Sequence, residues 1–398
     1  MKKFMILAAV AMLVGRASAA VRDTISLNAG WQFHLGELSG IEAVKNAKSE
    51  RVNLPHDFLI GQPWVEPDAS ERPDNSDAGS NVRSRLSPRG FKEMNVGWYR
   101  YVLTPKAEWK GRRVVLDFQG IMLVGDVWLN GKHIGKTDYG YLGFDTDISS
   151  MLKYDGDNEI IVKANTQQPN NSRWYTGGGL YRDVNIIVTD KKLYFPRHPL
   201  FIRTENNKKV KIQAEIACFN KVDNIPAEVK IYDANGEVVA QKKQNIVFNG
   251  KWRTREYELQ PIEIDNANLW SCESPYLYTA EVTLFDNQGN AVDQIREQFG
   301  VRTIEFSPDF GFKLNGKKVL LKGYANHHTL GALGAAAYPR AIEKRIQLMK
   351  SFGYNHIRTS HNPYSEDFMR LCDRYGILVV DALYDKWLTQ YAGGRVEW

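Results

Sequence analysis

The stretch NHIRTSHNPYSEDFMRLCDRYGILVVD, residues 355–381, decides the fold. It opens with a short apolar run that enters a cluster of Arg, Thr, Ser and His, after which Pro363 stops regular structure. Ser365 suits a helix N-cap because its hydroxyl can accept a backbone N–H of the first turn. Apolar residues at i, i+3, i+4 and i+7 then predict one buried helix face, which Gly376 can end. The apolar run from Ile377 to Val380 predicts a buried parallel strand.

The segment upstream predicts another strand and helix. Val319 to Leu321 is predicted as a buried strand, and Pro339 to Gly353 as a helix with one apolar face. Strand, helix, strand, helix, strand is the opening of a (β/α)8 TIM barrel, whose chemistry lies at the carboxyl ends of the strands. Asp381 follows the last of these strands. Because only three of the eight strands are recognisable, residues 303–398 are predicted to form an incomplete barrel domain.

The chain before the barrel segment has the alternating pattern of β-sandwiches. Val114 to Gln119 alternates with period two, and Asn130-Gly131 is a strong hairpin signal, so residues 21–190 predict a sandwich. Residues 191–302 repeat the pattern in a smaller unit with a turn at Asn235-Gly236. Short strands over about a hundred residues are typical of an immunoglobulin-like β-sandwich.

Residues 1–20 have the pattern of a secretory signal peptide. Lys2 and Lys3 precede an apolar run from Phe4 to Val14, and Ala17-Ser18-Ala19 suits cleavage. The apolar run is too short to span a bilayer, so we expect a secreted protein, in the bacterial periplasm, without a membrane anchor.

Composition excludes several classes of protein. The formal net charge is +6, and it falls to +3 without Lys2, Lys3 and Arg16, which predicts neither nucleic-acid nor membrane binding. Hydrophobic residues make up 43% of the 398 residues, enough for two or three cores. The three cysteines are too few and too widely spaced for a disulfide framework or a zinc site, and are expected to be buried.

Residues 355–381 also resemble, nearly residue for residue, the signature segment of glycoside hydrolase family 2, the family of β-galactosidases, β-glucuronidases and β-mannosidases. The first sandwich resembles the sugar-binding jelly roll of the same family, through the following stretches in order: GWQFHLGE, VNLPHDF, VGWYRYVL, DVWLNGKHIG, DYGYLGFDTDI and NSRWYTGGGLYRDVNI. The resemblance implies a jelly-roll domain at 21–190, an immunoglobulin-like domain at 191–302 and the start of a TIM barrel at 303–398.

The resemblance implies that part of a sugar-binding pocket lies on the barrel rim. His327 and His361 match family histidines that contact sugar hydroxyls, and imidazoles suit this role because they can both donate and accept hydrogen bonds. Arg358 matches the arginine that holds the nucleophilic carboxylate ionised and oriented. The alternative is that Arg358 and His361 only cap an αβ unit.

Two further residues are candidates for the pocket. Asp381 matches a barrel acid, although Ala382 replaces the glutamate that usually follows it. Trp174 lies in a jelly-roll loop that leans toward the barrel mouth in relatives, while the other tryptophans are expected to pack in the cores. For His328, a packing role and a functional role are weighted equally.

The resemblance implies retaining hydrolysis by two carboxyl groups that lie roughly 5 to 5.5 Å apart. In the family both are glutamates on later barrel strands, and the first follows an asparagine. Because no Asn-Glu pair occurs after Thr303, we expect both glutamates beyond Trp398, assign no catalytic residue, and predict that the chain alone is inactive. No metal or cofactor is predicted, and homo-oligomer formation is left open.

Substrate and activity retain alternatives. The run HHTLGALGAAAYP resembles shorter bacterial β-galactosidases, which favours a secreted exo-acting hydrolase of terminal β-galactosides, with a β-linked oligosaccharide or glycan as partner. A β-glucuronidase or β-mannosidase stays open within the family. Outside that activity, the chain could be a non-catalytic glycan-binding β-sandwich protein or an inactive fragment.

Overall fold

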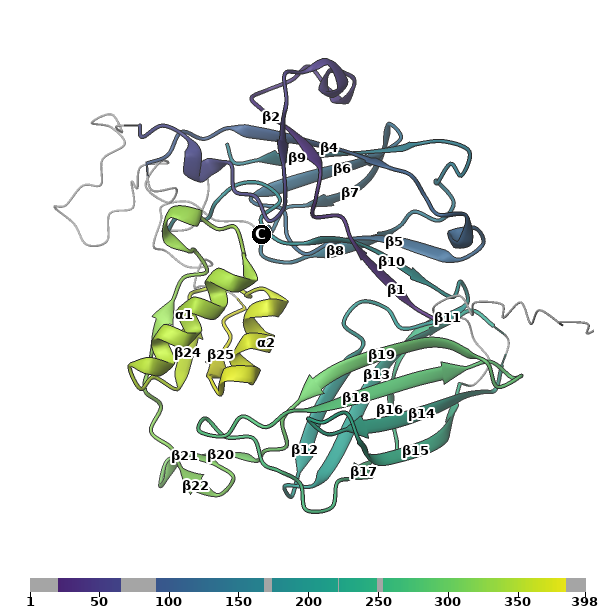
Figure 1. The fold of residues 1–398 in the computed structure, drawn as a ribbon, viewed down its shortest axis with the longest axis vertical. Helices are drawn as coiled ribbons and strands as arrows, with labels where there is room; N and C mark the ends of the chain where they lie inside the picture. The colour runs from purple at the N-terminus through teal and green to yellow at the C-terminus, as the bar shows by residue number, and fades with distance from the viewer. Residues whose placement is uncertain (1–20, 66–90, 168–173, 221, 249–252, 384–398) are drawn as a thin grey trace, which may run out of the picture.

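The computed structural model describes residues 21–65, 91–167, 174–220, 222–248 and 253–383. Within these ranges the chain forms two β-sandwiches and a smaller α/β segment (Figure 1). The predicted signal peptide, residues 1–20, lies outside the described residues. Among the described helices, none is long and apolar enough to cross a membrane.

The first sandwich consists of two antiparallel sheets. The smaller sheet contains, in spatial order, β1 (Asp23–Ser26), β10 (Val184–Thr189), β5 (Arg113–Phe118) and β8 (Phe144–Asp147). The larger sheet contains β3 (Glu50–Val52), β2 (Trp31–Leu35), β4 (Val96–Leu103), β9 (Asn158–Asn165), β6 (Val124–Leu129) and β7 (Lys132–Thr137). The hairpin predicted at Asn130-Gly131 is confirmed, because β6 and β7 pair across it. Short 3-10 helices lie at Ile41–Asn46, Leu59–Gly61 and Ala107–Trp109.

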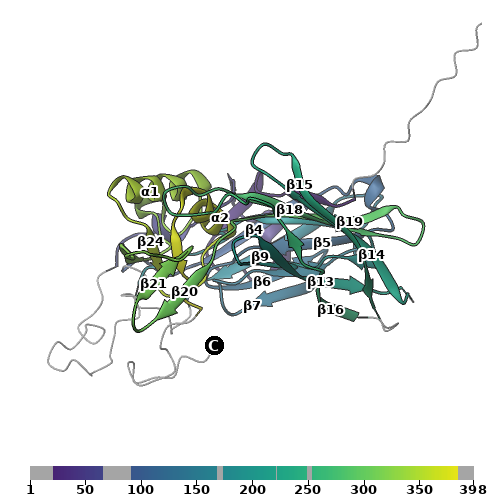
Figure 2. The ribbon, with the colours of Figure 1, turned by 90° about the horizontal axis from the view of Figure 1, so that it is seen from below.

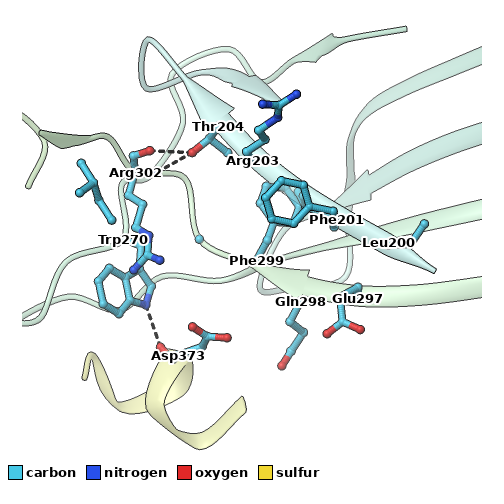
Figure 3. Close-up of a pocket in the computed structure, with 13 residues that line it drawn as sticks. Leu200, Phe201, Arg203, Thr204, Trp270, Glu297, Gln298, Phe299, Arg302 and Asp373 are labelled. Atoms are coloured by element: carbon cyan, nitrogen blue, oxygen red, sulfur yellow. Dashed lines mark hydrogen bonds between the residues drawn. The ribbon is translucent and has the colours of Figure 1, made fainter. Parts of the chain in front are cut away.

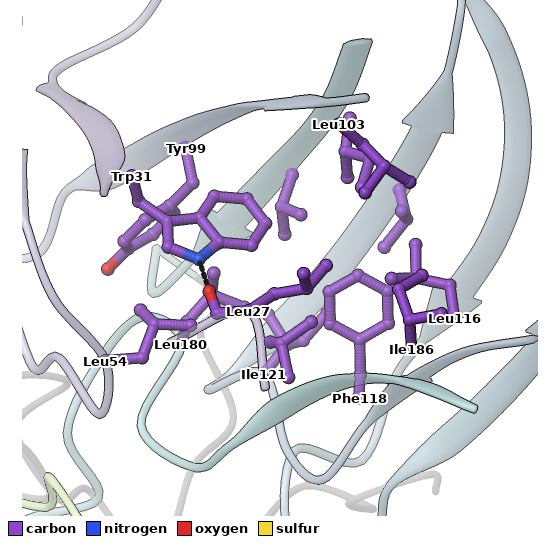
Figure 4. Packing of buried hydrophobic residues seen from close by; sticks show 14 of the residues in the cluster. Leu27, Trp31, Leu54, Tyr99, Leu103, Leu116, Phe118, Ile121, Leu180 and Ile186 are labelled. Atoms are coloured by element: carbon purple, nitrogen blue, oxygen red, sulfur yellow. Dashed lines mark hydrogen bonds between the residues drawn. The ribbon is translucent and has the colours of Figure 1, made fainter. Parts of the chain in front are cut away.

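A continuous apolar core fills the space between these sheets (Figure 4). Trp31 is fully buried, and its indole N–H donates to the Leu27 carbonyl at 2.6 Å, so the ring is both packed and satisfied. Leu116, Phe118 and Ile186 enter the core from the smaller sheet. The predicted core role of the tryptophans is confirmed for Trp31.

The second sandwich also has two antiparallel sheets. One contains β11 (Leu193–Tyr194), β13 (Lys209–Cys218) and β12 (Leu200–Glu205), with β16 (Arg253–Glu258) and β17 (Ile262–Glu263) also pairing with β13. The other contains β15 (Val238–Val247), β14 (Asn224–Tyr232), β18 (Tyr278–Phe285) and β19 (Ala291–Phe299). Alternate residues of β13 are buried in the core, and the turn at Asn235-Gly236 joins β14 to β15 as predicted.

The third part begins with a small antiparallel sheet of β20 (Ile304–Ser307), β21 (Gly311–Leu314) and β22 (Lys317–Lys318). A parallel sheet follows, in the order β23 (Gly323–Asn326), β24 (His356–Thr359) and β25 (Leu378–Val380). The helices α1 (Pro339–Ser351) and α2 (Glu366–Tyr375) connect its strands and lie side by side (Figures 1 and 2). A 3-10 helix, Gly331–Leu333, precedes α1.

The signals predicted at the ends of α2 are confirmed. The Ser365 hydroxyl accepts from the Phe368 N–H at 3.4 Å, and Gly376 adopts the left-handed conformation with φ of 70°. The fold class predicted from the sequence is therefore confirmed, with a jelly-roll sandwich, an immunoglobulin-like sandwich and the opening strands and helices of a barrel.

The position predicted for the first barrel strand is wrong. The ladder runs through Gly323–Asn326, whereas Leu320 is 73% exposed and Val319 packs beside Trp270. The strand escaped prediction because its sequence, GYAN, is not an apolar run. Gly323 lies so close to β24 that a Cβ there would come within 2.0 Å of the His356 carbonyl oxygen, so the pairing itself requires glycine.

The second sandwich is joined to the barrel segment by backbone-directed hydrogen bonds. The Trp270 indole N–H donates to the Asp373 carbonyl of α2 at 2.7 Å, and the Lys350 ammonium donates to the Cys272 carbonyl at 2.7 Å. Figure 3 shows Trp270, Asp373 and Arg302 around a cleft of about 510 Å³ at this junction. Burial raises the pKa of the Asp373 carboxyl to about 6.

Replacing Gly376 by alanine is expected to loosen this junction. A Cβ at Gly376 would lie 2.4 Å from the Cys272 carbonyl oxygen, in addition to the left-handed φ of 70°. The φ alone costs roughly 1–2 kcal/mol, and the clash adds about 1–3 kcal/mol. Gly353 is the matched control because it follows α1 with φ of 78° and open space around it. Thermal denaturation should show a clearly larger loss for Gly376→Ala than for Gly353→Ala, and equal losses would contradict the predicted clash.

Candidate functional site

The two histidines predicted to bind sugar and the possible pocket residue Trp174 meet where the first sandwich touches the barrel segment. The Trp174 ring centroid lies 4.9 Å from that of His327 and 5.1 Å from that of His361. The two imidazoles are 6.0 Å apart and nearly perpendicular, at 86°. Trp174 precedes β10 in the first sandwich, while the histidines follow β23 and β24, so the cluster joins two domains.

The backbone of the barrel rim orients His327. Its Nδ1 lies 2.8 Å from the Ser360 carbonyl oxygen, and since a carbonyl only accepts, Nδ1 carries a proton. In the neutral ring Nε2 is then an acceptor, and in the charged ring it is a donor. Arg345 of α1 donates to the carbonyl of His327 at 2.9 Å and to that of Thr329. These bonds fix the chain at the end of β23.

Sequence reasoning missed Arg345. Its signal was a charged residue beside the apolar face of α1, between the buried Ile342 and Ile346. Such a position is usually occupied by a side chain that snorkels to solvent. Here the guanidinium instead satisfies carbonyls of the loop after β23, and burial lowers its pKa.

Trp174 is only 9% exposed, and its indole N–H donates to the Tyr141 hydroxyl at 3.1 Å. The Tyr141 hydroxyl satisfies the indole nitrogen, while the ring itself contacts the two imidazoles. Another contact between the first sandwich and the barrel segment involves Arg182. Arg182 donates to the Tyr141 carbonyl at 2.9 Å and to the Pro363 carbonyl at 2.8 Å, which joins the first sandwich to the loop after His361.

Arg358 and Asp381 lie on the same parallel sheet. Arg358 is in the central strand β24, in register with Ala325 and Val380 of the neighbouring strands. Asp381 follows β25, and its carboxylate accepts from the Thr359 hydroxyl at 2.7 Å. Burial raises the pKa of the Asp381 carboxyl, and the Thr359 bond opposes this rise. The roles predicted for these residues and for the ring cluster stay predictions.

The structure favours a packing role for His328. Its Nε2 lies 3.3 Å from the Thr176 carbonyl oxygen of the first sandwich. Its ring packs against Tyr141 and Tyr181, with centroids 5.4 and 5.9 Å away. Burial of the imidazole lowers the pKa of His328 to about 3, so the ring is neutral at ordinary pH.

The lowered pKa makes His328 a source of acid sensitivity. In the unfolded chain His328 binds a proton near pH 6.5, whereas in the folded chain it binds one only near pH 3. The contribution of neutral His328 to the free energy of unfolding is therefore complete above pH 6.5 and is lost as the pH falls from 6.5 toward 3. Between these pH values, this histidine changes the free energy of unfolding by up to about 1.4 kcal/mol per pH unit. In His328→Gln, unfolding free energies measured from pH 7 to 4 should depend less steeply on pH. His133→Gln, at an exposed histidine, should keep the parent slope. An unchanged slope in His328→Gln would contradict the assignment.

No group of three or more His, Cys, Asp or Glu side chains in the described ranges is arranged to hold a metal ion. The cleft of Figure 3 is lined by none of the five candidate residues. What the candidate cluster offers is an indole face beside two imidazoles at the ends of adjacent parallel strands. Aromatic faces and imidazoles suit the C–H faces and hydroxyls of a sugar ring.

A jelly-roll sandwich, an immunoglobulin-like sandwich and a barrel segment with such a rim define the class of multidomain glycoside hydrolases. Residues 91–182 match the glycosyl hydrolase 2 galactose-binding domain-like family, residues 198–302 match glycosyl hydrolases family 2, and residues 308–385 match the TIM barrel domain of glycosyl hydrolases family 2. Together these segments cover more than half of the chain. The chain belongs to glycosyl hydrolase family 2.

Individual relatives agree with this assignment. A β-galactosidase of Bacteroides ovatus, BoGH2A, is 30% identical over 383 residues, which cover 92% of this chain and 42% of that protein. A β-glucuronidase of Bacteroides fragilis is 28% identical over 373 residues, covering 90% of this chain and 49% of that protein. A crystal structure of a family 2 member from Bacteroides cellulosilyticus superposes with a TM-score of 0.81 at 33% identity, covering 92% of this chain and 46% of that one. The chain therefore spans just under half the length of these relatives.

Proposed function

We propose that the protein removes terminal β-linked galactose from oligosaccharides or glycans, and that this chain supplies the sugar-binding rim. The observation that carries the proposal is the contact of Trp174 with both His327 and His361 at the ends of adjacent barrel strands. The β-galactosidase among its relatives supports galactose as the sugar. The run HHTLGALGAAAYP, which begins at His327, also supports the β-galactosidase branch of the family.

The geometry suggests how the rim would act. Nδ1 of His327 bonds the Ser360 carbonyl, so a hydrogen bond from this ring to a sugar hydroxyl would be made through Nε2. Bonds of this kind accelerate hydrolysis only if they tighten as positive charge develops on the sugar ring. A retaining reaction needs two carboxyl groups in addition, one as nucleophile and one as acid and base. Arg358, in the central strand, would hold the nucleophile ionised.

A β-glucuronidase is the second candidate, because relatives of similar identity bear that name. Two histidines alone do not separate the two sugars, since each sugar presents vicinal hydroxyls that imidazoles can bond. The signal-like residues 1–20 support secretion, and a bacterial periplasmic enzyme acting on extracellular glycans would fit such a leader.

Kinetics test the proposal directly. The protein expressed from its own gene should hydrolyse nitrophenyl β-galactoside with a kcat/KM at least tenfold above those for the β-glucuronide and β-mannoside. The product released first should retain the β-configuration by NMR. Preference for the glucuronide would replace the galactoside proposal, and tight glycan binding without turnover of any of the three would favour a binding protein.

A further inference from the structure

We propose that Asp57 is a positioning residue of the sugar-binding rim. It lies in the first sandwich, just before the 3-10 helix Leu59–Gly61, and does not belong to the ring cluster. Its carboxylate ties the segment that carries Trp174 to the barrel loop that follows β23 and begins with His327 and His328. The inference rests on the proposed function for its effect on sugar binding, while the placement of Trp174 can be tested without any sugar.

The Asp57 carboxylate is 6% exposed and accepts four hydrogen bonds. Oδ1 accepts from the backbone N–H of Leu59 and of Gly178, both at 2.9 Å. Oδ2 accepts from the Tyr175 hydroxyl and from the Ala335 N–H, both at 2.7 Å. Four short bonds to one carboxylate from three separate segments form a rigid junction.

Three of the four donors come from segments of the site, and the fourth, the Leu59 N–H, is local to Asp57. Tyr175 directly follows Trp174, and Gly178 lies three residues further along the same segment. Ala335 lies in the loop between β23 and α1, and Arg345 holds the start of that loop at His327 and Thr329. Asp57 therefore holds the Trp174 segment at a fixed distance from the barrel loop.

The surrounding backbone leaves no room for a different arrangement. A Cβ at Gly177 would lie 2.4 Å from the Ala335 Cβ and 2.9 Å from Oδ2 of Asp57. A Cβ at Gly334 would lie 2.2 Å from the same oxygen. Both glycines also have positive φ, 83° and 63°. Close packing on both sides means that Asp57 cannot move without moving the Trp174 segment or the barrel loop.

Asparagine is the informative substitution at position 57. It keeps the volume, but its NH2 group can only donate, so the two donors that now face one carboxylate oxygen lose their acceptor. Burial raises the pKa of the Asp57 carboxyl while the four bonds lower it, which marks these bonds as the compensation for burying the group. Loss of these two hydrogen bonds should shift the Trp174 segment relative to the rim.

The test uses the 398-residue chain labelled with 5-fluorotryptophan. The 19F resonance of Trp174 is assigned as the signal missing in Trp174→Phe. Asp57→Asn should displace or broaden this resonance and weaken galactose binding about ten- to a hundredfold, as expected for a misplacement near 1 Å. Asp293→Asn is the matched control. Asp293 is a fully buried carboxylate that accepts from Arg22 at 2.9 and 2.7 Å and from the Phe195 N–H at 2.7 Å.

The outcomes separate the two proposals. Asp293→Asn should lower the melting temperature but leave the Trp174 resonance and the galactose affinity unchanged. If Asp57→Asn behaves in the same way, its role is only structural and the inference is overturned. If the parent chain does not bind galactose, the proposed function fails, and the resonance alone still decides for Asp57. Should Asp57→Asn not fold, Tyr175→Phe removes one of the four donors, and an unmoved Trp174 resonance in that variant would overturn the inference.

Discussion

The 398-residue chain on its own is expected to show no hydrolysis of nitrophenyl β-galactoside above a buffer blank. Retaining hydrolysis needs a nucleophile and a proton donor, both carboxyl groups, roughly 5 to 5.5 Å apart. The sequence after Thr303 contains no Asn-Glu pair, and two of its acids lie in surroundings that do not form a carboxylate pair. Asp381 is bonded to Thr359, and Asp373 lies at the junction with the second sandwich.

The assay should use purified chain and a β-galactosidase as positive control. Turnover that is well above the blank, and is abolished by Asp381→Asn or Asp373→Asn, would show that the chain holds its own catalytic carboxylates. That result would contradict the proposal that this chain supplies a sugar-binding rim without the catalytic carboxylates.

In the protein expressed from its own gene, His361→Ala is expected to lower kcat/KM by about two to four powers of ten. The imidazole lies 5.1 Å from Trp174 and 6.0 Å from His327 across the rim, where its bonds to sugar hydroxyls would strengthen in the transition state. The effect should fall mainly on kcat, because uniform binding would change only KM.

His133→Ala is the matched control for this variant. His133 also packs its ring against a tryptophan, Trp128, with centroids 5.3 Å apart, but it lies on the exposed side of the first sandwich in the hairpin of β6 and β7. It should leave kcat/KM unchanged. Loss of cooperative melting in His361→Ala, with unchanged kinetics per folded molecule, would instead identify His361 as a capping residue.

The sequence predicted the elements whose signals are local. Helix α2 begins after Ser365 and ends before Gly376 as predicted, because capping depends on one hydroxyl and one left-handed residue. The hairpin at Asn130-Gly131 follows from the same kind of local preference. The first barrel strand was misplaced because three apolar residues look alike in a strand or a packed connection. Its true position depends on a contact with β24 that only Gly323 allows.

The candidate site was predicted in part, and largely through family resemblance. Resemblance named His327, His361 and Trp174 separately, but their contact arises from a domain interface that no local pattern encodes. Asp57 and Arg345 were not predicted for the same reason. Ala335, a partner of Asp57, lies 278 residues away in the sequence, and Arg345 bonds backbone carbonyls. Every residue has a backbone carbonyl, so the sequence does not show which of them will accept such a bond.

The most direct measurement is a crystal structure of the chain soaked with galactose. If the rim binds the sugar, electron density for one ring should lie against Trp174, with hydroxyls within hydrogen-bonding distance of Nε2 of His327 and of the His361 imidazole. The same soak of His361→Ala should show weaker density or none. Galactose bound only at another surface, or an empty rim at saturating sugar in a lattice that leaves it open, would contradict the assignment of this cluster as the sugar-binding site.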